Sequence, residues 1–516
     1  MKSSRSVGSR KVLFLTNIEN GESNVFLATS QALLELDPDI EIHFATFRGF
    51  EESIIKTWQQ TRQTAPRAKP IIYHEIKGKS MLEGVKNCFA SGREHYERQD
   101  NMPESFTYPL RFSTTIRAIR DTVSIFLPYS GSEFFEIFSS VLEIISQVSA
   151  NLVVVNSLMT PALTACFHLR VRSMCLSPNT IKDFAAQSQP FTTRLRYPAL
   201  FSGFSYPVPW TQVPLNLFYN LYAGVSWITS KNRKEAQEQL RSEAGASLVT
   251  PLDLVCRIPR NLKILVSGLP ELDFPLALPS HIFPCGPIVR KSASVSDVDT
   301  DLEAWLARGP TIYINMGTLF RTTETQAIEI AKALQIVLAS TKEQKSVVSR
   351  FQVLWKLRKS QNDQAATASH GVHDILGHDI ESDRVRIVDW IAVEPISVLQ
   401  TGHIICSVHH GGANSFNEAV IAGVPQVVLP QWIDTYDFAH RIELLGIGRL
   451  GNRTTKPQII APDLARELLD ILQGDSAEEI RKRANAFAKV CKAGGEGAKN
   501  AAALILAECD ADLANP

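Results

Sequence analysis

The residues best suited to chemistry gather in the segment 406–450, where an apolar run ends in two histidines followed by two glycines. Gly411 and Gly412 carry no Cβ, so backbone amides at these positions can approach a ligand closely. The helix predicted to follow them offers unpaired N–H groups and a partial positive charge at its N-terminus. These groups together predict a binding site for an anion such as a pyrophosphate.

Polar side chains are spaced along the same segment so that they can complete this site. His410 can donate a hydrogen bond to a phosphate oxygen, and Asn414 and Ser415 can cap the helix or bind the phosphate directly. Glu418 lies one helical turn after Asn414 on the same face, where a carboxylate can accept hydrogen bonds from two ribose hydroxyls. The next predicted strand leads to Asp434, which we expect at the same cleft.

The order of these residues resembles the signature box of UDP-sugar-dependent glycosyltransferases with the GT-B fold. The matching residues are His410, Gly411, Gly412, Asn414, Ser415, Glu418, Gly423, Val424, Pro425, Pro430 and Asp434. The family's box begins with a tryptophan, which Trp390 supplies. The run DTYDFAHRIELLGIG is most similar to fungal members, and CGPI, YINMGT and VLWKLR extend weaker similarity over most of the chain.

The resemblance implies a role for each matching residue. Trp390 would stack on uracil and Glu418 would bind the ribose. The diphosphate would be held by Thr318, His410, Gly411, Gly412, Asn414 and Ser415. The sugar hydroxyls would contact Asp434 and its neighbour Thr435, which stands where plant members usually have glutamine. The UDP-sugar is then a co-substrate, and neither a cofactor nor a metal is expected, because a helix dipole and a histidine act on the leaving UDP.

The first half of the chain departs from the family at the catalytic base. Many members carry a histidine after the first strand and an aspartate that orients it. Here the corresponding positions are Glu22 and Asn156. A buried carboxylate can act as a base if its pKa rises toward neutrality, which makes Glu22 the candidate base and Asn156 its candidate orienter. The alternative is that Glu22 is an ordinary exposed loop residue.

Alternating strand and helix patterns predict two doubly wound α/β domains facing a cleft. We expect a disordered tail at 1–10 and an acceptor-binding domain at 11–288. A polar linker at 289–301 then leads to a nucleotide-sugar-binding domain at 302–475. Two C-terminal helices at 476–516 are expected to pack back toward the first domain.

The composition and charge of the chain exclude some classes of binding partner. The 516 residues carry 53 basic and 53 acidic side chains, and a neutral chain lacks the basic field that nucleic-acid binding needs. No apolar run is long enough to span a membrane, although peripheral membrane contact stays open. Eight scattered cysteines, with no CxxC pair, indicate reduced thiols in the cytoplasm. The resemblance implies two partners, a UDP-sugar as the donor and an apolar hydroxylated molecule as the acceptor.

Other signals have simpler interpretations. The aspartates at 297, 299 and 301 could hold a metal, but they precede a predicted helix and suit capping better. His409 and His410 are adjacent at a strand end and should point to opposite faces, so they should not share a metal. The aromatic-rich regions 78–145 and 180–245 are expected to be mostly core, with some side chains lining an acceptor cleft.

The predicted activity is inverting transfer of a hexose to a hydroxyl of a sterol, terpenoid, polyketide or sphingoid lipid. Two alternatives remain at this stage. One is a nucleotide-sugar epimerase on the same scaffold, and the other is a non-catalytic subunit that binds a UDP-sugar, which the missing His–Asp pair suggests.

Overall fold

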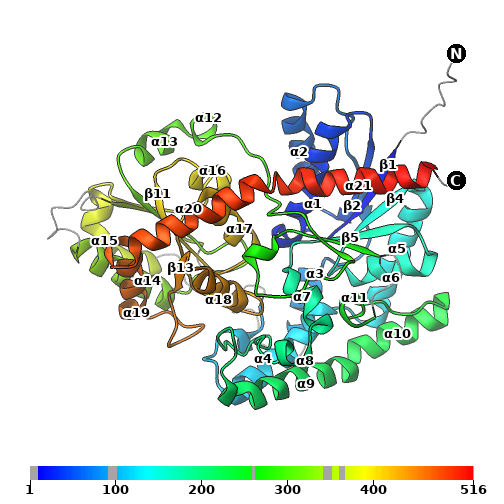
Figure 1. Cartoon of the computed structure of the whole chain (residues 1–516), viewed down its shortest axis with the longest axis horizontal. Helices are drawn as coiled ribbons and strands as arrows, with labels where there is room; N and C mark the ends of the chain where they lie inside the picture. The colour runs from blue at the N-terminus through cyan, green and yellow to red at the C-terminus, as the bar shows by residue number, and fades with distance from the viewer. Residues whose placement is uncertain (1–9, 91–101, 258–261, 341–350, 359–366, 515–516) are drawn as a thin grey trace.

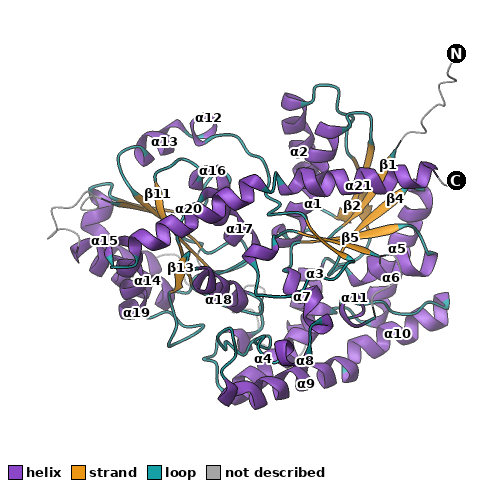
Figure 2. Cartoon of the chain, viewed as in Figure 1, coloured by secondary structure: helices purple, strands orange, loops and turns teal. Residues whose placement is uncertain are grey.

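Two parallel β-sheets organise the chain (Figures 1 and 2). The computed structural model describes residues 10–90, 102–257, 262–340, 351–358 and 367–514. Most of the tail predicted at 1–10 therefore lies outside the described residues. Most strands of both sheets are short and almost fully buried, as expected for strands covered by helices on both faces, and the edge strands are more exposed.

The first sheet has seven strands in the order β3-β2-β1-β4-β5-β6-β7, all pairing in parallel. Its strands are β1 (Lys11–Leu15), β2 (Glu41–Phe47), β3 (Ile72–Ile76), β4 (Leu152–Asn156), β5 (Ser173–Ser177), β6 (Lys263–Val266) and β7 (Ile282–Pro284). Chain order reverses between β1 and β4, where ligands bind in open α/β sheets.

The second sheet has six parallel strands in the order β10-β9-β8-β11-β12-β13. Its strands are β8 (Thr311–Asn315), β9 (Gln352–Lys356), β10 (Val385–Val388), β11 (Ile404–His409), β12 (Gln426–Val428) and β13 (Gly448–Leu450). Its order reverses between β8 and β11. The two sheets confirm the predicted pair of α/β domains. The strands β7 and β13 have three residues each and lie at sheet edges.

Helices cover the sheets and connect their strands. In the first half they are α1 (Asn20–Leu36), α2 (Glu51–Thr64), α3 (Met81–Ala90), α4 (Phe112–Phe126), α5 (Gly131–Val148), α6 (Thr160–Leu169), α7 (Ile181–Ala185), α8 (Phe191–Arg194), α9 (Val213–Thr229), α10 (Lys231–Ala244) and α11 (Asp253–Cys256). In the second half they are α12 (Val295–Val298), α13 (Thr300–Leu306), α14 (Glu324–Ser340), α15 (Thr367–Glu381), α16 (Pro395–Leu399), α17 (Ala413–Ala422), α18 (Thr435–Leu445), α19 (Ala461–Gln473), α20 (Ala477–Ala493) and α21 (Gly497–Ala514).

The segment between the sheets is more ordered than a plain polar linker, because it contains α12 and the start of α13. The Asp299 side chain accepts a hydrogen bond from the Leu302 N–H at 2.9 Å, and the Ser294 hydroxyl caps α12. These contacts confirm the capping interpretation of this aspartate.

The last helix, α21, crosses back to the first domain and lies along α1 (Figure 1). Ala501, Ala502, Ile505 and Cys509 of α21 are fully buried in the same core cluster as β1 and α1. Glu508 pairs with Arg172 and Lys263 on the sheet side. The C-terminal helix is thus part of the core of the first domain.

Candidate active site

The site lies where the carboxyl ends of the two sheets face each other, at the two points where strand order reverses. From the first sheet, β1 leads into α1 and β4 ends at Asn156. From the second, β11 leads into α17. The Asn414 amide donates to the Asn20 carbonyl at 3.0 Å, so the N-terminal turns of α17 and α1 touch across the domain boundary.

The glycine turn before α17 has the shape predicted for an anion site. Gly411 has a φ of +89°, and a Cβ there would lie 2.8 Å from the Thr435 carbonyl oxygen. A Cβ on Gly412 would lie 2.6 Å from the His410 ring. Larger residues at either position would therefore strain the loop. No acidic residue lies in the first turn of α17, so its positive end is open to an anion.

The two histidines have different surroundings. His409 is buried, with Nε2 2.8 Å from the Gln426 side-chain oxygen and Nδ1 accepting from the Gly411 N–H at 3.1 Å. His410 faces the site, and its Nδ1 has no hydrogen-bond partner among the described residues. Burial lowers the pKa of His410 to about 3, so its ring is neutral and offers a hydrogen bond rather than a charge.

Glu22 is not an exposed loop residue. The helix α1 begins at Asn20, and Glu22 lies in its first turn with 9% of its surface exposed. Burial raises the pKa of Glu22 to about 7, and nearby Glu19 and Asp434 add to the shift. Its Oε2 atom has no partner among the described residues.

The structure brings Asn156 to Glu22. A hydrogen bond from the Asn156 side chain opposes the rise in the Glu22 pKa. The Asn156 amide also donates to the Thr16 hydroxyl at 3.2 Å, and its carbonyl oxygen accepts from the Leu158 N–H at 2.8 Å. These backbone and hydroxyl contacts hold the Asn156 side chain in place beside the carboxylate.

Asp434 approaches the same place from the second domain. Burial raises the pKa of Asp434 to about 7, with Asp183 and Asp437 as further causes and Arg441 acting in the opposite direction. Glu22 and Asp434 therefore belong to different sheets but share one electrostatic environment. Each raises the cost of ionising the other.

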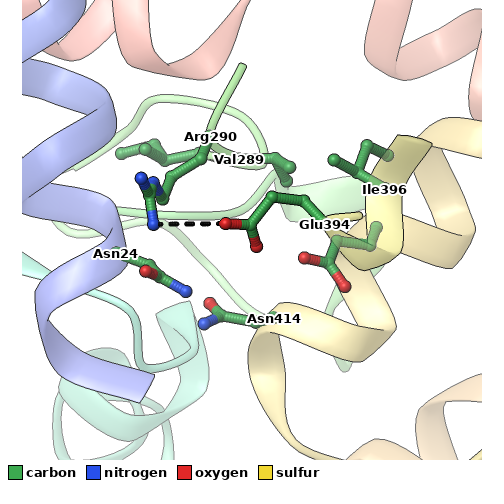
Figure 3. A pocket seen from close by; sticks show the side chains of 8 residues that line it. Asn24, Val289, Arg290, Glu394, Ile396 and Asn414 are labelled. Atoms are coloured by element: carbon green, nitrogen blue, oxygen red, sulfur yellow. Dashed lines mark ion pairs between the residues drawn. The ribbon is translucent and has the colours of Figure 1, made fainter. Parts of the chain in front are cut away.

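A pocket between the domains lies beside this site (Figure 3). Its lining residues are Asn24, Ile288, Val289, Arg290, Glu394, Ile396, Asn414 and Glu418. The Arg290 guanidinium approaches the Glu394 carboxylate at 3.6 Å across the pocket. Burial and the nearby Glu394 raise the pKa of Glu418 to about 8.

Three polar residues of this pocket were not predicted from the sequence. Asn24 lies one helical turn from Asn20, and Arg290 stands in the segment interpreted only as a linker. Glu394 follows Trp390 closely in the sequence, and this nearness to the predicted uracil-binding tryptophan is the signal that could have found it.

Trp390 is 58% exposed at the end of β10, and two cations approach its ring. The Lys356 ammonium lies 4.1 Å and the Arg358 guanidinium 5.5 Å from the ring centre. Burial lowers the pKa of Lys356 to about 8, with Arg358 contributing and Glu394 and Glu418 opposing. Both cations come from the run VLWKLR.

The remaining predicted residues lie around the same loops. Thr318 follows β8, and its backbone carbonyl accepts a hydrogen bond from the Arg358 side chain at 2.6 Å. Ser415 lies in the first turn of α17. The Thr435 hydroxyl accepts from the N–H groups of Gln431 and Trp432 at 3.0 and 2.9 Å. That hydroxyl therefore supports the loop that carries Asp434.

The chain is similar in sequence to known glycosyltransferases. Residues 374–493 match the family model described as Erythromycin biosynthesis protein CIII-like, C-terminal domain. The chain is 29% identical over 513 residues to the glycosyltransferase sdnJ of Sordaria araneosa, covering 95% of this chain and 96% of that one. It is also 30% identical over 213 residues to UDP-glycosyltransferase 84A1 of Arabidopsis thaliana, covering 39% and 40%.

The chain is a glycosyltransferase that resembles UDP-glycosyltransferases in sequence. Its fold agrees, since a UDP-glucosyltransferase from Polygonum tinctorium superposes with a TM-score of 0.60 at 15% identity, covering 98% of this chain and all of that one. TcCGT1 in complex with UDP superposes with a TM-score of 0.62 at 13% identity, covering 98% and 100%. This glycosyltransferase therefore has the GT-B fold that the sequence predicted.

Proposed function

We propose that this glycosyltransferase moves a hexose from a UDP-sugar to a hydroxyl of a lipophilic small molecule, with inversion at the anomeric carbon and without a metal. The observation that carries this proposal is the buried Glu22 carboxylate. Its pKa is raised to about 7, and it lies beside Asp434 and next to the anion site of α17. A group with that pKa can both take and release a proton near neutral pH.

The second domain supplies the donor site. The N–H groups at Gly412 and in the first turn of α17, with the neutral His410, are placed to hold the diphosphate. Glu418 lines the interdomain pocket, where it would meet the ribose, and Trp390 would meet the uracil ring. These hydrogen-bond donors stabilise the charge that develops on UDP as it leaves, which is the role a metal ion plays in other enzymes.

The first domain supplies the base. The Glu22 carboxylate would accept the proton of the acceptor hydroxyl, and the oxygen would attack the anomeric carbon from the side opposite UDP. The sugar–phosphate bond breaks as the new glycosidic bond forms. A single displacement of this kind inverts the anomeric centre, and Asp434 is placed to orient the sugar hydroxyls during it.

Apolar side chains near Asp434 support a lipophilic acceptor. One buried cluster joins the two domains and includes Phe106, Phe201 and Tyr219 with Tyr436, while Trp432 packs against it. The Phe201 and Tyr436 ring centres are 6.1 Å apart. Aromatic packing of this kind between the domains near Asp434 favours a lipophilic acceptor that carries its hydroxyl to Glu22.

The test is incubation with a panel of UDP-hexoses and apolar alcohols, read by mass spectrometry, with the anomeric configuration of any product determined by NMR. We expect a glycoside of inverted configuration and equimolar UDP, with activity kept in the presence of a chelator. Interconversion of UDP-hexoses without an acceptor would favour an epimerase. Tight UDP binding with no product on any acceptor would favour a non-catalytic subunit.

A further inference from the structure

The helix α9 has its apolar residues on the outside. Trp210, just before it, is 74% exposed, and Leu221 and Ile228 are 62% and 63% exposed. Together with Leu217, Phe218 and Val225, these residues lie within about 100° of one another around the helix at about 100° per residue, so they share one face. We call these six residues, 210, 217, 218, 221, 225 and 228, the α9 stripe.

The opposite face of α9 is the one that packs on the protein. Asn216, Tyr219 and Trp227 are buried, and α9 contacts α4 along its length. Phe112 of α4 is exposed and its ring stacks on Phe218 at 5.6 Å, which extends the apolar surface onto the neighbouring helix. In Figure 1, α9 and α10 form the lower edge of the molecule. A surface helix ordinarily presents polar residues outward, so this orientation is reversed.

Basic residues outnumber acidic ones in the segments that flank the α9 stripe in sequence and pack beside it. The segments 111–126 and 210–235 contain six basic and two acidic residues, and α9 itself contains none of either kind. Arg111, Arg117 and Arg120 are exposed on or next to α4, and Lys231 and Lys234 are exposed in the first turn of α10. One acid, Asp121, is hydrogen-bonded to Ser105 at 2.6 Å. An apolar face with a cationic border complements a bilayer with anionic headgroups.

We propose that the α9 stripe docks this enzyme on the surface of an anionic phospholipid bilayer. The stripe would enter the headgroup region, with Trp210 at one end of it, while the border arginines and lysines contact lipid phosphates. The helix lies on the membrane and does not cross it, because its other face is already packed on α4. Consistent with this, no helix among the described residues has the length and apolarity that a membrane crossing needs.

Vesicle co-sedimentation tests the proposal with three variants. Leu221→Glu places a charge at the centre of the α9 stripe. Ile336→Glu is the matched control, because Ile336 is also an exposed aliphatic residue, on α14 of the second domain. The double variant Lys231→Glu/Lys234→Glu reverses the cationic border. Vesicles of phosphatidylcholine with and without phosphatidylserine separate the apolar contribution from the electrostatic one.

We expect the wild type to bind phosphatidylserine vesicles and Leu221→Glu to bind at least about tenfold more weakly, with Ile336→Glu unchanged. The border variant should lose the dependence on phosphatidylserine, and added salt should weaken wild-type binding. Equal binding by wild type and Leu221→Glu, or no binding by either, would overturn the proposal.

A second copy of the chain is the competing occupant of the α9 stripe. Sedimentation velocity without lipid would reveal it, since a wild-type dimer that Leu221→Glu dissociates would assign the stripe to self-association instead. Sugar transfer to a water-soluble alcohol should be the same in Leu221→Glu and wild type. Membrane docking and the transfer reaction are therefore tested by separate measurements.

Discussion

The turns that begin α1 and α17 both lie at the reversal of strand order in their sheets, yet they carry opposite chemistry. Each follows the strand next to the reversal of strand order and opens a helix toward the cleft. The turn before α17 has two glycines, a neutral histidine and no acid in the first helical turn. The turn before α1 places two buried carboxylates, Glu19 and Glu22, at the helix start.

The difference teaches that a helix N-terminus is not by itself an anion site. At α17 the positive helix end is left open and favours a phosphate. At α1 the same position already holds carboxyl groups, and burial raises the pKa values of Glu19 and Glu22 even though a helix N-terminus favours ionisation. One domain is thus arranged to bind a negative group and the other to exchange a proton.

Replacing the carboxylate at α1 should have the largest effect. Glu22→Gln keeps the size of the side chain but cannot accept the proton, so kcat should fall by about 10²- to 10⁴-fold while UDP affinity stays. Glu19→Gln is the control, since Glu19 is also buried and accepts a structural hydrogen bond from the Leu82 N–H at 3.0 Å. Steady-state kinetics and UDP calorimetry measure both. A wild-type kcat in Glu22→Gln would assign the proton transfer elsewhere.

The acid limb of the pH profile should sharpen the comparison. The base acts when ionised, so kcat/KM should fall about tenfold per pH unit below the pKa of Glu22, which is raised to about 7. Asp434→Asn removes a nearby like charge, so the same limb should move to lower pH. A limb that stays in place in Asp434→Asn would show that the two carboxyl groups do not interact.

At α17, loss of the histidine should have a smaller effect. His410→Ala removes one hydrogen bond to a charged oxygen, and kcat/KM should fall about 10- to 100-fold. His403→Ala is the control and should retain wild-type kinetics, because His403 precedes the first residue of β11, at the end of the strand away from His410. Initial rates at varied UDP-sugar concentration measure both variants. If the two alanine variants behaved alike, His410 would not bind the diphosphate.

The smallest effect is one of stability. In the folded protein the pKa of Glu418 is raised to about 8, so its ionised form opposes folding. The free energy of unfolding therefore falls as the pH rises from the pKa of Glu418 in the unfolded chain toward its pKa in the folded one. Glu418→Gln should therefore raise the free energy of unfolding by about 1 kcal/mol at about pH 9 and leave it unchanged at about pH 4, while weakening UDP binding. Thermal unfolding at both pH values measures this. Exposed Glu478→Gln should change neither value.

The sequence predicted the second domain's turn well because its chemistry is local. The glycine conformation, the helix start and the spacing from His410 to Glu418 all lie within ten residues, and the structure reproduces them. The burial of Glu22 is not local. It depends on where α1 begins and on contact with Asn156 and Asp434, which are far away in the chain.

Two other features escaped prediction for similar reasons. Arg290 reaches the interdomain pocket from a segment with no apolar period, and only the folded chain brings it to Glu394. The aromatic regions were expected to be mostly core, which holds for Phe134 and Phe138. It does not hold for Trp210 and Phe218, because periodicity shows that residues share a face but not whether the protein covers it.

The position of α21 against α1 also fixes an order of events during synthesis. Residues Ala501, Ile505 and Cys509 complete a core whose strands and first helix are translated at the very start of the chain. Until α21 leaves the ribosome, the apolar face of α1 beside it remains open to water or to chaperones. The helix that carries Glu22 therefore reaches its final packing only after the whole second sheet has been translated.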